Sequence, residues 1–347
     1  METFWYVAVT LMLAVYVVLD GFDFGLGIVY SFVAKTETDR RAALAAIGPI
    51  WNGNEVWLIA AGGLLFFAFP KAYSAGFSGF YLALHLVLWL LIGRGLALEL
   101  RSHVDHALWR QFWDVAFAGA SLLLAIVFGV ALGNLIRGVP LNPEGYFFVA
   151  LWTNFMTGPE PGILDWFTIL IGATSAAILA MHGANYLAMK TEGRLQERAR
   201  RAAWLTRSAV VILVGLALTA VPFVQPLFYL NYAAHPIGYL FPVLTVATLL
   251  GALEIRRRDW DAGAFFATSL LILTMLASTA WGSYPNILIA TSDPANSLTV
   301  TNAAAGAYGM QIGLWWFLVG FSLLIVYQAC AHQAFRGKVK LGADGFH

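Results

Sequence analysis

Long apolar segments, separated by short polar or proline-rich breaks, occupy most of this chain of 347 residues. A helix needs about 20 consecutive apolar residues to cross the hydrocarbon core of a bilayer. Nine segments are long enough, at residues 3–34, 48–69, 76–100, 112–136, 163–189, 203–228, 236–255, 261–283 and 309–332. The sequence therefore predicts an all-α integral membrane protein with about nine transmembrane helices. It predicts a single transmembrane domain over residues 1–347, compatible with two four-helix bundles plus one helix, and no soluble domain.

The composition agrees with a membrane location and excludes several kinds of protein. Hydrophobic residues make up 60% of the chain and charged residues only 11%, whereas a soluble domain has about 25% charged residues. A net charge of +1 offers no basic excess for phosphate groups, which argues against a nucleic-acid partner. A single cysteine, Cys330, excludes an intramolecular disulfide and a multi-cysteine metal site. The N-terminal apolar stretch is too long for a cleavable signal peptide and has no basic region before it, so we expect none.

The distribution of basic residues predicts how the chain is oriented, because Lys and Arg favour the cytoplasmic side of a membrane. Sixteen of the 20 Lys and Arg residues lie in the connections after odd-numbered segments or in the C-terminal tail. The connections on the opposite side hold only Lys71 and Arg137. This asymmetry predicts an N-terminus outside, a C-terminus in the cytoplasm and an odd number of crossings.

The second segment opens with a polar motif, Gly48-Pro-Ile-Trp-Asn-Gly-Asn-Glu-Val-Trp57, which places Glu55 and two amides in the first turns of a membrane helix. A carboxyl group at membrane depth is costly and indicates a partner or a pathway. Asn52 lies one turn before Glu55 on the same face, and Pro49 and Gly53 loosen the backbone there. Two interpretations of Glu55 follow: it takes up and passes protons, or it is an acid at a helix end that reaches cytoplasmic water.

Two further acids, Asp20 and Asp23, lie in the first segment and share a helix face because they are three residues apart. Gly21 and Gly25 form a pair of small residues that lets another helix approach closely, so we expect the acids to face protein in the inner half of the membrane. The two acids are interpreted either as a structural pair, hydrogen-bonded to backbone or to an arginine such as Arg94, or as a proton relay. Arg94 itself is predicted to extend toward the inner surface.

His85 and His182 are the histidines that lie well inside predicted spans. A b-type haem with two histidine ligands needs them at matching depth. The predicted orientation puts His85 in the outer half of the membrane and His182 in the inner half. The sequence therefore predicts two hydrogen-bonded packing histidines, and neither a haem-ligand pair nor a metal site in this chain.

Several short motifs, most of them in residues 20–81, together point to one known family. They are Asp20-Gly-Phe-Asp-Phe-Gly-Leu-Gly27, Arg40-Arg41, Gly48-Pro-Ile-Trp-Asn-Gly-Asn-Glu-Val-Trp-Leu58, Ala61-Gly-Gly-Leu-Leu-Phe-Phe-Ala-Phe-Pro70, Phe77-Ser-Gly-Phe-Tyr81, Tyr284-Pro-Asn286 and Ser297-Leu-Thr-Val-Thr-Asn302. The chain resembles subunit II of the cytochrome bd-type quinol oxidases. Residues 103–280 match that family mainly in hydropathy.

The resemblance implies a terminal oxidase of a prokaryotic respiratory chain, located in the cytoplasmic (inner) membrane. It implies a partner, subunit I, that carries a pair of b-type haems, a haem d and the quinol-oxidising loop, whereas this chain binds no redox cofactor directly. Quinol and O2 are the implied substrates of the complex. Small single-helix accessory subunits and a structural quinone or lipid are further implied components.

The resemblance also assigns roles to individual residues. The family has an aspartate in a cytoplasmic proton path at a position where this chain has Asn52. An amide cannot donate and accept protons as a carboxyl group does, so we expect Glu55 to take this role while Asn52 orients water. Asp20 and Asp23 match the paired acids of the first helix and complete the predicted proton path. Trp57 matches a tryptophan associated with the oxygen entry channel. No catalytic residue is predicted in this chain.

Two other classes of membrane protein were weighed against this interpretation. An ion- or proton-coupled secondary transporter could use Asp20, Asp23 and Glu55 for coupling. Such a carrier should show inverted repeats and helices broken at the midplane, and the sequence shows neither clearly. A di-haem membrane cytochrome is disfavoured by the depths of the histidines. Co-purification with a haem-bearing partner separates an oxidase subunit from a carrier.

Overall fold

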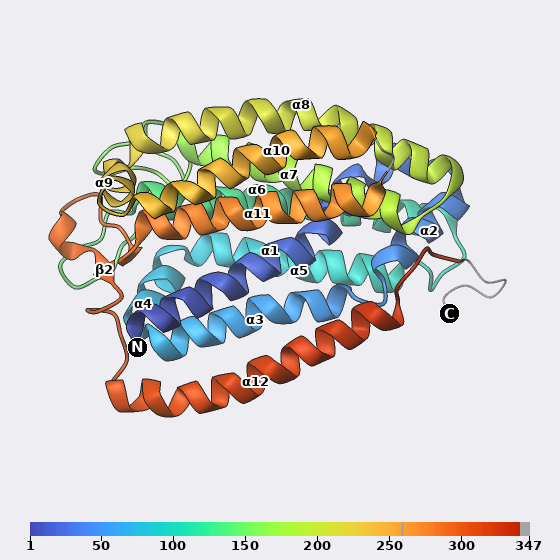
Figure 1. The fold of residues 1–347 in the computed structure, drawn as a ribbon. Helices are drawn as coiled ribbons and strands as arrows, with labels where there is room; N and C mark the ends of the chain where they lie inside the picture. Colours follow the sequence, from blue (N-terminus) through green and yellow to red (C-terminus); the bar gives the residue numbers. More distant parts are fainter. Residues whose placement is uncertain (258–259, 341–347) are drawn as a thin grey trace.

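The computed structural model describes residues 1–257 and 260–340, with the backbone alone for residues 252–257. Within these ranges the chain is helical apart from one short hairpin and the loops (Figure 1). The elements are α1 Glu2–Val33, α2 Glu37–Ile47, α3 Trp51–Ala68, α4 Pro70–Gly79, α5 Tyr81–Leu100, α6 Ala107–Arg137, α7 Trp166–Lys190, α8 Gly193–Val224, α9 Pro226–Ala234, η1 Pro236–Tyr239, α10 Leu240–Arg257, α11 Asp261–Ser283, β1 Asn286–Leu288, η2 Pro294–Asn296, β2 Leu298–Thr299 and α12 Ala307–Ala334.

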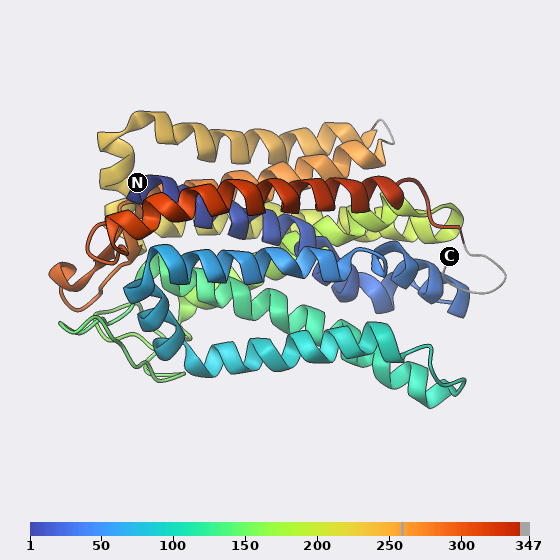
Figure 2. The ribbon, with the colours of Figure 1, turned by 90° about the horizontal axis from the view of Figure 1, so that it is seen from below.

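Most of these helices are long enough and apolar enough to cross a membrane. By length and composition seven of the described helices qualify, namely α1, α5, α6, α7, α8, α11 and α12. The number rises to eight if α9 and Pro236–Gly251, which are bent by 113°, form one broken span. α3 lies alongside the others (Figures 1 and 2), but Asn52, Asn54 and Glu55 lower its hydropathy. The all-α membrane architecture is confirmed, whereas the count of nine and the orientation stay predictions.

The helix boundaries expected from hydropathy are wrong at several places. The predicted segment 76–100 is divided between α4, which ends at Gly79, and α5, which begins at Tyr81. α8 begins at Gly193 instead of residue 203, because its first turns are rich in arginine and extend beyond the apolar run. The predicted segment 203–228 is also divided, because α8 ends at Val224 and α9 begins at Pro226, a residue type that suits the first turn of a helix.

α1 runs through the middle of the bundle and packs against α3, α6, α7 and α11 (Figures 1 and 2). The predicted close approach at Gly21 and Gly25 is confirmed, and its partner is α7. A Cβ atom on Gly25 would collide with the backbone of Leu179 and Gly183, so small residues are required for this contact. The packing places both Asp20 and Asp23 in the interior, where neither is exposed.

α12 differs from the central helices because it lies along the edge of the bundle, next to α3 (Figure 1). In the most apolar 18-residue stretch of α12 only 6% is buried, compared with 67% in that of α7. Large apolar side chains such as Trp315, Trp316 and Leu323 are exposed on it. In a membrane these side chains face lipid or another protein chain.

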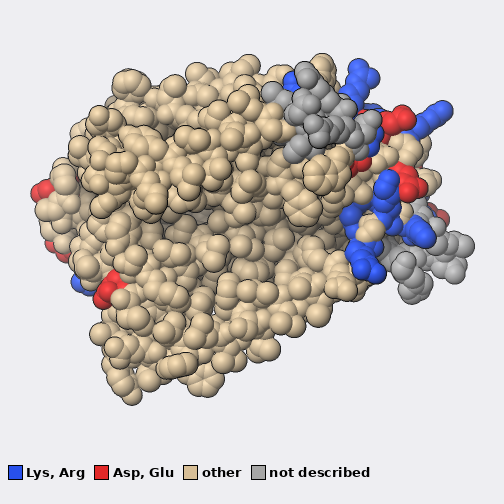
Figure 3. Space-filling view, in the orientation of Figure 1, with Lys and Arg blue, Asp and Glu red and all other residues tan. Residues whose placement is uncertain are grey.

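Charged side chains gather at the end of the molecule where α2 lies and α12 ends (Figures 1 and 3). Arg101 of α5 donates to both oxygens of Glu37, at 3.0 and 2.9 Å, and to Asp114 of α6 at 2.6 Å. Tyr30 and Arg40 also donate to Asp114, at 2.7 and 2.9 Å. The hydrogen bonds from Arg101 hold the pKa of Glu37 below its usual range. This network fastens α2 across the ends of α1, α5 and α6.

The opposite end of the bundle carries the long loops and the hairpin (Figure 1). β1 and β2 pair in antiparallel fashion, with Asn286 opposite Thr299. Arg137, at the end of α6, binds Asp165, which caps the first turn of α7 through the amides of Phe167 and Thr168. The loop between α6 and α7 is therefore held at both of its ends by one buried ion pair.

Candidate acid–arginine site inside the bundle

Arg94 is the centre of a buried ionic cluster formed by α1, α3 and α5. One of its terminal nitrogens donates to Asp20 Oδ1 at 2.7 Å, and the other binds Glu55 Oε1. The guanidinium carbon also lies 4.5 Å from the centre of the Phe24 ring, a distance typical of a cation–π contact. Arg94 has no exposed surface, so the prediction that it extends toward the membrane surface is wrong. Two carboxyl groups from different helices hold it inside.

Asp23 lies near this cluster but is bound by an amide. Asn54 Nδ2 donates to Asp23 Oδ2 at 3.0 Å and to the carbonyl of Leu19 at 3.2 Å. Gln328 of α12 donates in turn to Asn54 Oδ1 at 2.9 Å. The spacing of Asp20 and Asp23 correctly predicted that both face protein. It could not show that the two acids have different partners, which come from different helices.

Several buried polar atoms of the cluster have no hydrogen-bond partner among the described residues. They are Asp20 Oδ2, Asp23 Oδ1, Arg94 Nε and Gln328 Oε1. Buried polar atoms are usually hydrogen-bonded, and ordered water satisfies those that protein leaves unpaired. The cluster holds one guanidinium for three carboxyl groups, so acidic groups outnumber basic groups in this part of the interior.

Glu55 connects this interior site with the surface. Its side chain is 23% exposed, whereas that of Asp20 is fully buried. Asn52 lies on the exposed face of α3, in a stripe with Val56 and Ile59. The structure therefore brings Glu55, Asp20 and Asp23 together around Arg94. Asn52 is not part of this cluster, because it lies one turn before Glu55 on the exposed face of α3.

Trp57 faces the interior of the bundle. Its side chain is 4% exposed, and its ring lies edge-on to Phe321 of α12 with the centroids 6.1 Å apart. Its indole Nε1 is buried without a protein partner. Trp57 belongs to the apolar cluster that includes Met12, Tyr16 and Phe24, so it occupies the seam between α1, α3 and α12.

The two histidines within spans have different surroundings. His182 is fully buried, with Nδ1 2.8 Å from Thr268 Oγ1 and Nε2 3.0 Å from the carbonyl of Val18. The prediction of a packing histidine is confirmed there. His85 instead lies on the exposed face of α5 and makes a contact of 2.9 Å with the carbonyl of Tyr81. Because both ring nitrogens of His182 are occupied, the pair does not fit the geometry of two axial haem ligands.

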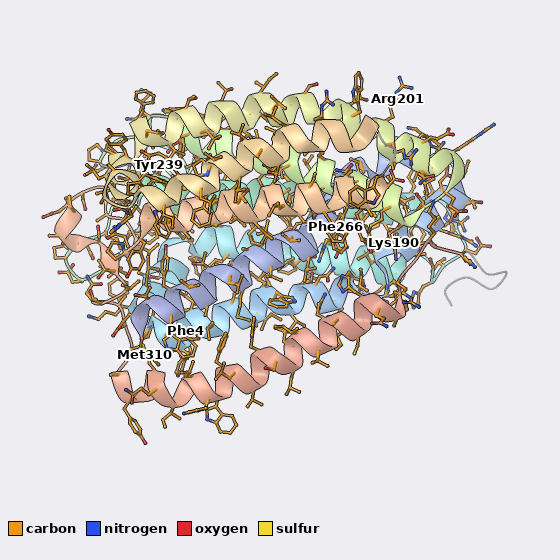
Figure 4. The ribbon with its side chains drawn as sticks, in the orientation of Figure 1. Phe4, Lys190, Arg201, Tyr239, Phe266 and Met310 are labelled. Carbon is orange, nitrogen blue, oxygen red and sulfur yellow. The ribbon has the colours of Figure 1, made fainter. Side chains whose placement is uncertain are left out.

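A cavity of about 370 Å³ lies on the other side of α1 from α3, among α6 to α11. Most of its lining is apolar, and a few hydroxyl groups from Thr174, Ser175, Thr245 and Ser278 interrupt it. Tyr239, where the chain bends into α10 (Figure 4), forms part of the wall. The apolar lining suits an apolar molecule with few polar groups.

Sequence analysis missed Asn54 and Gln328 as members of the site. Asn54 was visible in the motif at residues 48–57, but its partner was not. Gln328 is an uncharged polar residue of the largely apolar helix α12, which also contains Gln311 and Gln333, so its position in the sequence was a weak signal. Arg94 was named as a partner of the acids, but its contact with Glu55 depends on how α3 and α5 face each other.

The fold and the acid–arginine cluster define a multi-pass membrane protein with a charged interior site, a class that includes respiratory complexes and ion-coupled carriers. Comparison with known proteins identifies the family. The sequence matches the family Cytochrome bd terminal oxidase subunit II over residues 1–335, and the chain belongs to that family.

Individual relatives agree with this assignment. The chain is 31% identical over 363 residues to Cytochrome bd-I ubiquinol oxidase subunit 2 of Escherichia coli (strain K12), which covers 96% of this chain and 94% of the relative. It is 30% identical over 337 residues to Cytochrome bd ubiquinol oxidase subunit 2 of Bacillus subtilis (strain 168), with 96% of each chain covered. The solved structure of bd oxidase from Geobacillus thermodenitrificans has the same fold, with a TM-score of 0.76, 18% identity, and 96% of this chain and 98% of that chain covered.

The chain is therefore a multi-pass membrane subunit of a bacterial respiratory oxidase of the bd type. Membership of this family implies a quinol oxidase complex that contains haems and a subunit I.

Proposed function

We propose that this chain is the haem-free subunit II of a quinol:O2 oxidoreductase and that it supplies protons and oxygen to a haem-bearing subunit I. The observation that carries the proposal is the cluster of Glu55, Arg94 and Asp20, which has one partly exposed acid and two buried charged partners. The family implies the complex, and this cluster suggests what the subunit contributes to it. The proposed location is the cytoplasmic (inner) membrane, with nine crossings.

The proposed proton path begins at Glu55. Reduction of one O2 to two waters consumes four protons, and drawing them from the cytoplasm separates charge without a pump. The basic end of the bundle, with α2 and the end of α12 (Figure 3), is the proposed cytoplasmic side. Glu55 exchanges protons, Asn52 orients water on the outer face of α3, and Asp20 and Asp23 hold the interior end of the path. Asp20 has a further structural role, because it shares Arg94 with Glu55.

The exposed face of α3, which carries Asn52, is the proposed contact with subunit I. Asn52 is exposed there among Val56, Ile59 and Phe66, and the carboxyl group of Glu55 is partly exposed beside it. Polar groups at this depth are costly in lipid, so a protein surface is the more favourable neighbour. This contact would place Glu55 next to the chain that consumes the protons.

We assign the haems, a pair of b type and one of d type, to the partner subunit. His182 uses both ring nitrogens in hydrogen bonds, and His85 faces outward from α5, so these residues do not fit a haem. The cavity lined by Thr174 and Thr245 is the proposed site of a structural quinone or lipid, because it is apolar and large enough for part of an isoprenoid or acyl chain. Small single-helix accessory subunits are also proposed.

The direct test of the proposed function is to purify the complex through a tag on this chain. We expect co-purification of a haem-bearing subunit, b- and d-type absorption bands, and O2 consumption that depends on added quinol. Extraction of the same sample should release a quinone or phospholipid retained through washing. Recovery of the folded chain without a haem-bearing partner would contradict the proposal and favour the alternative, an ion- or proton-coupled carrier that uses the same acids.

Replacing Trp57 with alanine tests the proposed oxygen route. O2 is small and apolar, and Trp57 fills the apolar seam between α1, α3 and α12. A smaller side chain widens this seam and should therefore change the apparent affinity of the complex for O2. The apparent affinity for quinol should stay the same. Equal O2 dependence of W57A and the parent complex would remove Trp57 from the route.

A further inference from the structure

A chain of polar side chains connects the basic end of α12 with Asp23. His332 lies in the last turn of α12, half-buried, with Nδ1 3.0 Å from the carbonyl of Gln328 and 3.3 Å from its side-chain nitrogen. Gln328 donates to Asn54, and Asn54 donates to Asp23. Three helices, α12, α3 and α1, thus contribute to one continuous line of polar contacts.

The end of α12 is fixed to the basic end of the bundle. Lys190, at the end of α7 (Figure 4), donates to the carbonyl of Phe335 at 2.6 Å, and the amide of Val339 donates back to the carbonyl of Lys190 at 2.8 Å. These two contacts hold the last turn of α12 beside α7 at the proposed cytoplasmic side. His332 is therefore kept at the surface end of the polar chain, although the rest of α12 has few buried residues.

The side chains alone cannot carry a proton along this line, because an amide N–H that donates cannot also accept. Water is needed, and two atoms of the chain are available to bind it. Gln328 Oε1 and Asp23 Oδ1 are buried and have no partner within the part of the chain that the structure describes, and their residues are 9% and 0% exposed. Buried polar atoms in this state usually bind ordered water.

We propose that His332, Gln328 and Asn54 form a second proton entry, which runs along α12 and leads to Asp23. This inference rests on the proposed function, because it assumes that the acid–arginine site receives protons for O2 reduction. This second entry begins at His332 of α12, whereas the first begins at Glu55 of α3. His332 is the surface group that binds and releases the proton, and Gln328 and Asn54 are positioning residues.

The transfer balances without any further reactant. A proton from cytoplasmic water binds the imidazole of His332, and the imidazolium passes a proton to water held at Gln328 Oε1. Water between the two unpaired oxygens relays a proton to Asp23 Oδ1, so the carboxylate becomes a carboxylic acid and His332 returns to its neutral form. Asp23 then releases the proton toward the oxygen-reducing subunit and is ready for the next transfer.

The experiment compares His332→Ala, Gln328→Met and Glu55→Gln in the intact complex, at saturating quinol and O2. His332→Ala should lower kcat about threefold or more, given the usual size of proton-transfer contributions, and leave the KM for quinol unchanged. Added imidazole should restore the rate of H332A, because the small base replaces the missing side chain. Gln328→Met should lower kcat without rescue by imidazole. Gln333→Met is the matched control for Gln328→Met. Gln333 is exposed on α12, one position after His332, and the variant should behave as the parent.

The outcomes separate this inference from the proposed function. If H332A and Q328M turn over like the parent while E55Q is slow, the α12 entry is wrong and the proposed function stands. If H332A is slow and imidazole does not restore it, the α12 entry is also wrong. If H332A is slow and rescued while E55Q is normal, the α12 entry holds and the role assigned to Glu55 fails. Normal rates in all three variants and in the double variant H332A with E55Q would exclude proton delivery through this chain.

Discussion

Replacing Arg94 with glutamine is expected to destabilise the assembled complex strongly. Arg94 is the shared partner of Asp20 and Glu55, and its side chain has no exposed surface. Removing one member of a buried ion pair leaves the other charge without compensation, which costs about 3–5 kcal/mol. We therefore expect R94Q to lower the thermal midpoint of the detergent-solubilised complex strongly, measured as loss of its elution peak after heating. Arg94→Lys should be intermediate, because one ammonium group does not match two carboxyl groups as a guanidinium does.

Two comparisons show whether the effect comes from this cluster. Arg41→Gln removes an exposed arginine whose contact with Glu37 spans 3.3 Å, and such surface pairs contribute about 0.3–0.5 kcal/mol, so its midpoint should barely change. The triple variant R94Q with Asp20→Asn and Glu55→Gln has no unpaired charge at these three positions and should recover part of the lost stability. A midpoint for R94Q equal to that of R41Q would show that the cluster does not stabilise the complex.

Replacing Glu55 with glutamine is expected to slow turnover while the complex still assembles. Glutamine retains the shape of the side chain and an oxygen that can accept from Arg94, and Asp20 continues to pair with Arg94. It removes the titratable proton, and a positioned acid or base contributes about 100-fold or more to a proton-transfer step. We expect quinol-dependent O2 consumption to fall by about tenfold or more, because other entries can carry part of the flux. The haem absorption spectrum should not change.

The position of the acid on α3 can be tested separately from its presence. Glu55→Asp should retain part of the activity, and adding Asn52→Asp to E55Q should restore part of it, since residue 52 lies one turn away on the same outer side of α3. Glu99→Gln is the matched control, because Glu99 is an exposed acid of α5 outside the cluster. Normal turnover of E55Q together with slow turnover of Asp20→Asn would reverse the roles of the two acids. If neither change slows turnover, proton uptake runs through the partner subunit alone.

The stability loss expected for R94Q and the turnover loss expected for E55Q can be measured separately because the acids of the cluster differ in burial. Asp20 and Asp23 have no exposed surface, whereas Glu55 is partly exposed. A change at Asp20 therefore affects both the packing around Arg94 and any proton path, and its two effects are hard to separate. A change at Glu55 leaves the buried Asp20–Arg94 pair in place, so turnover and stability can respond independently. Glu55 is for this reason the more informative residue to replace first.

The sequence by itself determined the membrane character of the chain, the approximate place of each long helix and the family. These features are local: about 20 apolar residues predict a span wherever they occur, and the motifs at residues 20–27 and 48–58 are continuous in the chain. The close approach of α1 to a neighbour was also predictable, because Gly21 and Gly25 lie one turn apart. Helix ends were less predictable at Gly79 and Gly193, where hydropathy does not mark the boundary.

Only the tertiary structure decided which polar groups meet. Arg94 contacts Asp20 and Glu55 because α5 is rotated so that this residue faces both α1 and α3, and nothing in its own segment specifies that rotation. The same holds for Gln328, which reaches Asn54 from a position 274 residues further along the chain. Asn52 lies one turn before Glu55, but three residues at 3.6 per turn leave the two side chains about 60° apart around α3, and this difference decides that Asn52 is exposed while Glu55 reaches Arg94. Contacts between helices depend on their relative rotation and depth, and hydropathy and spacing within one segment contain no information about either.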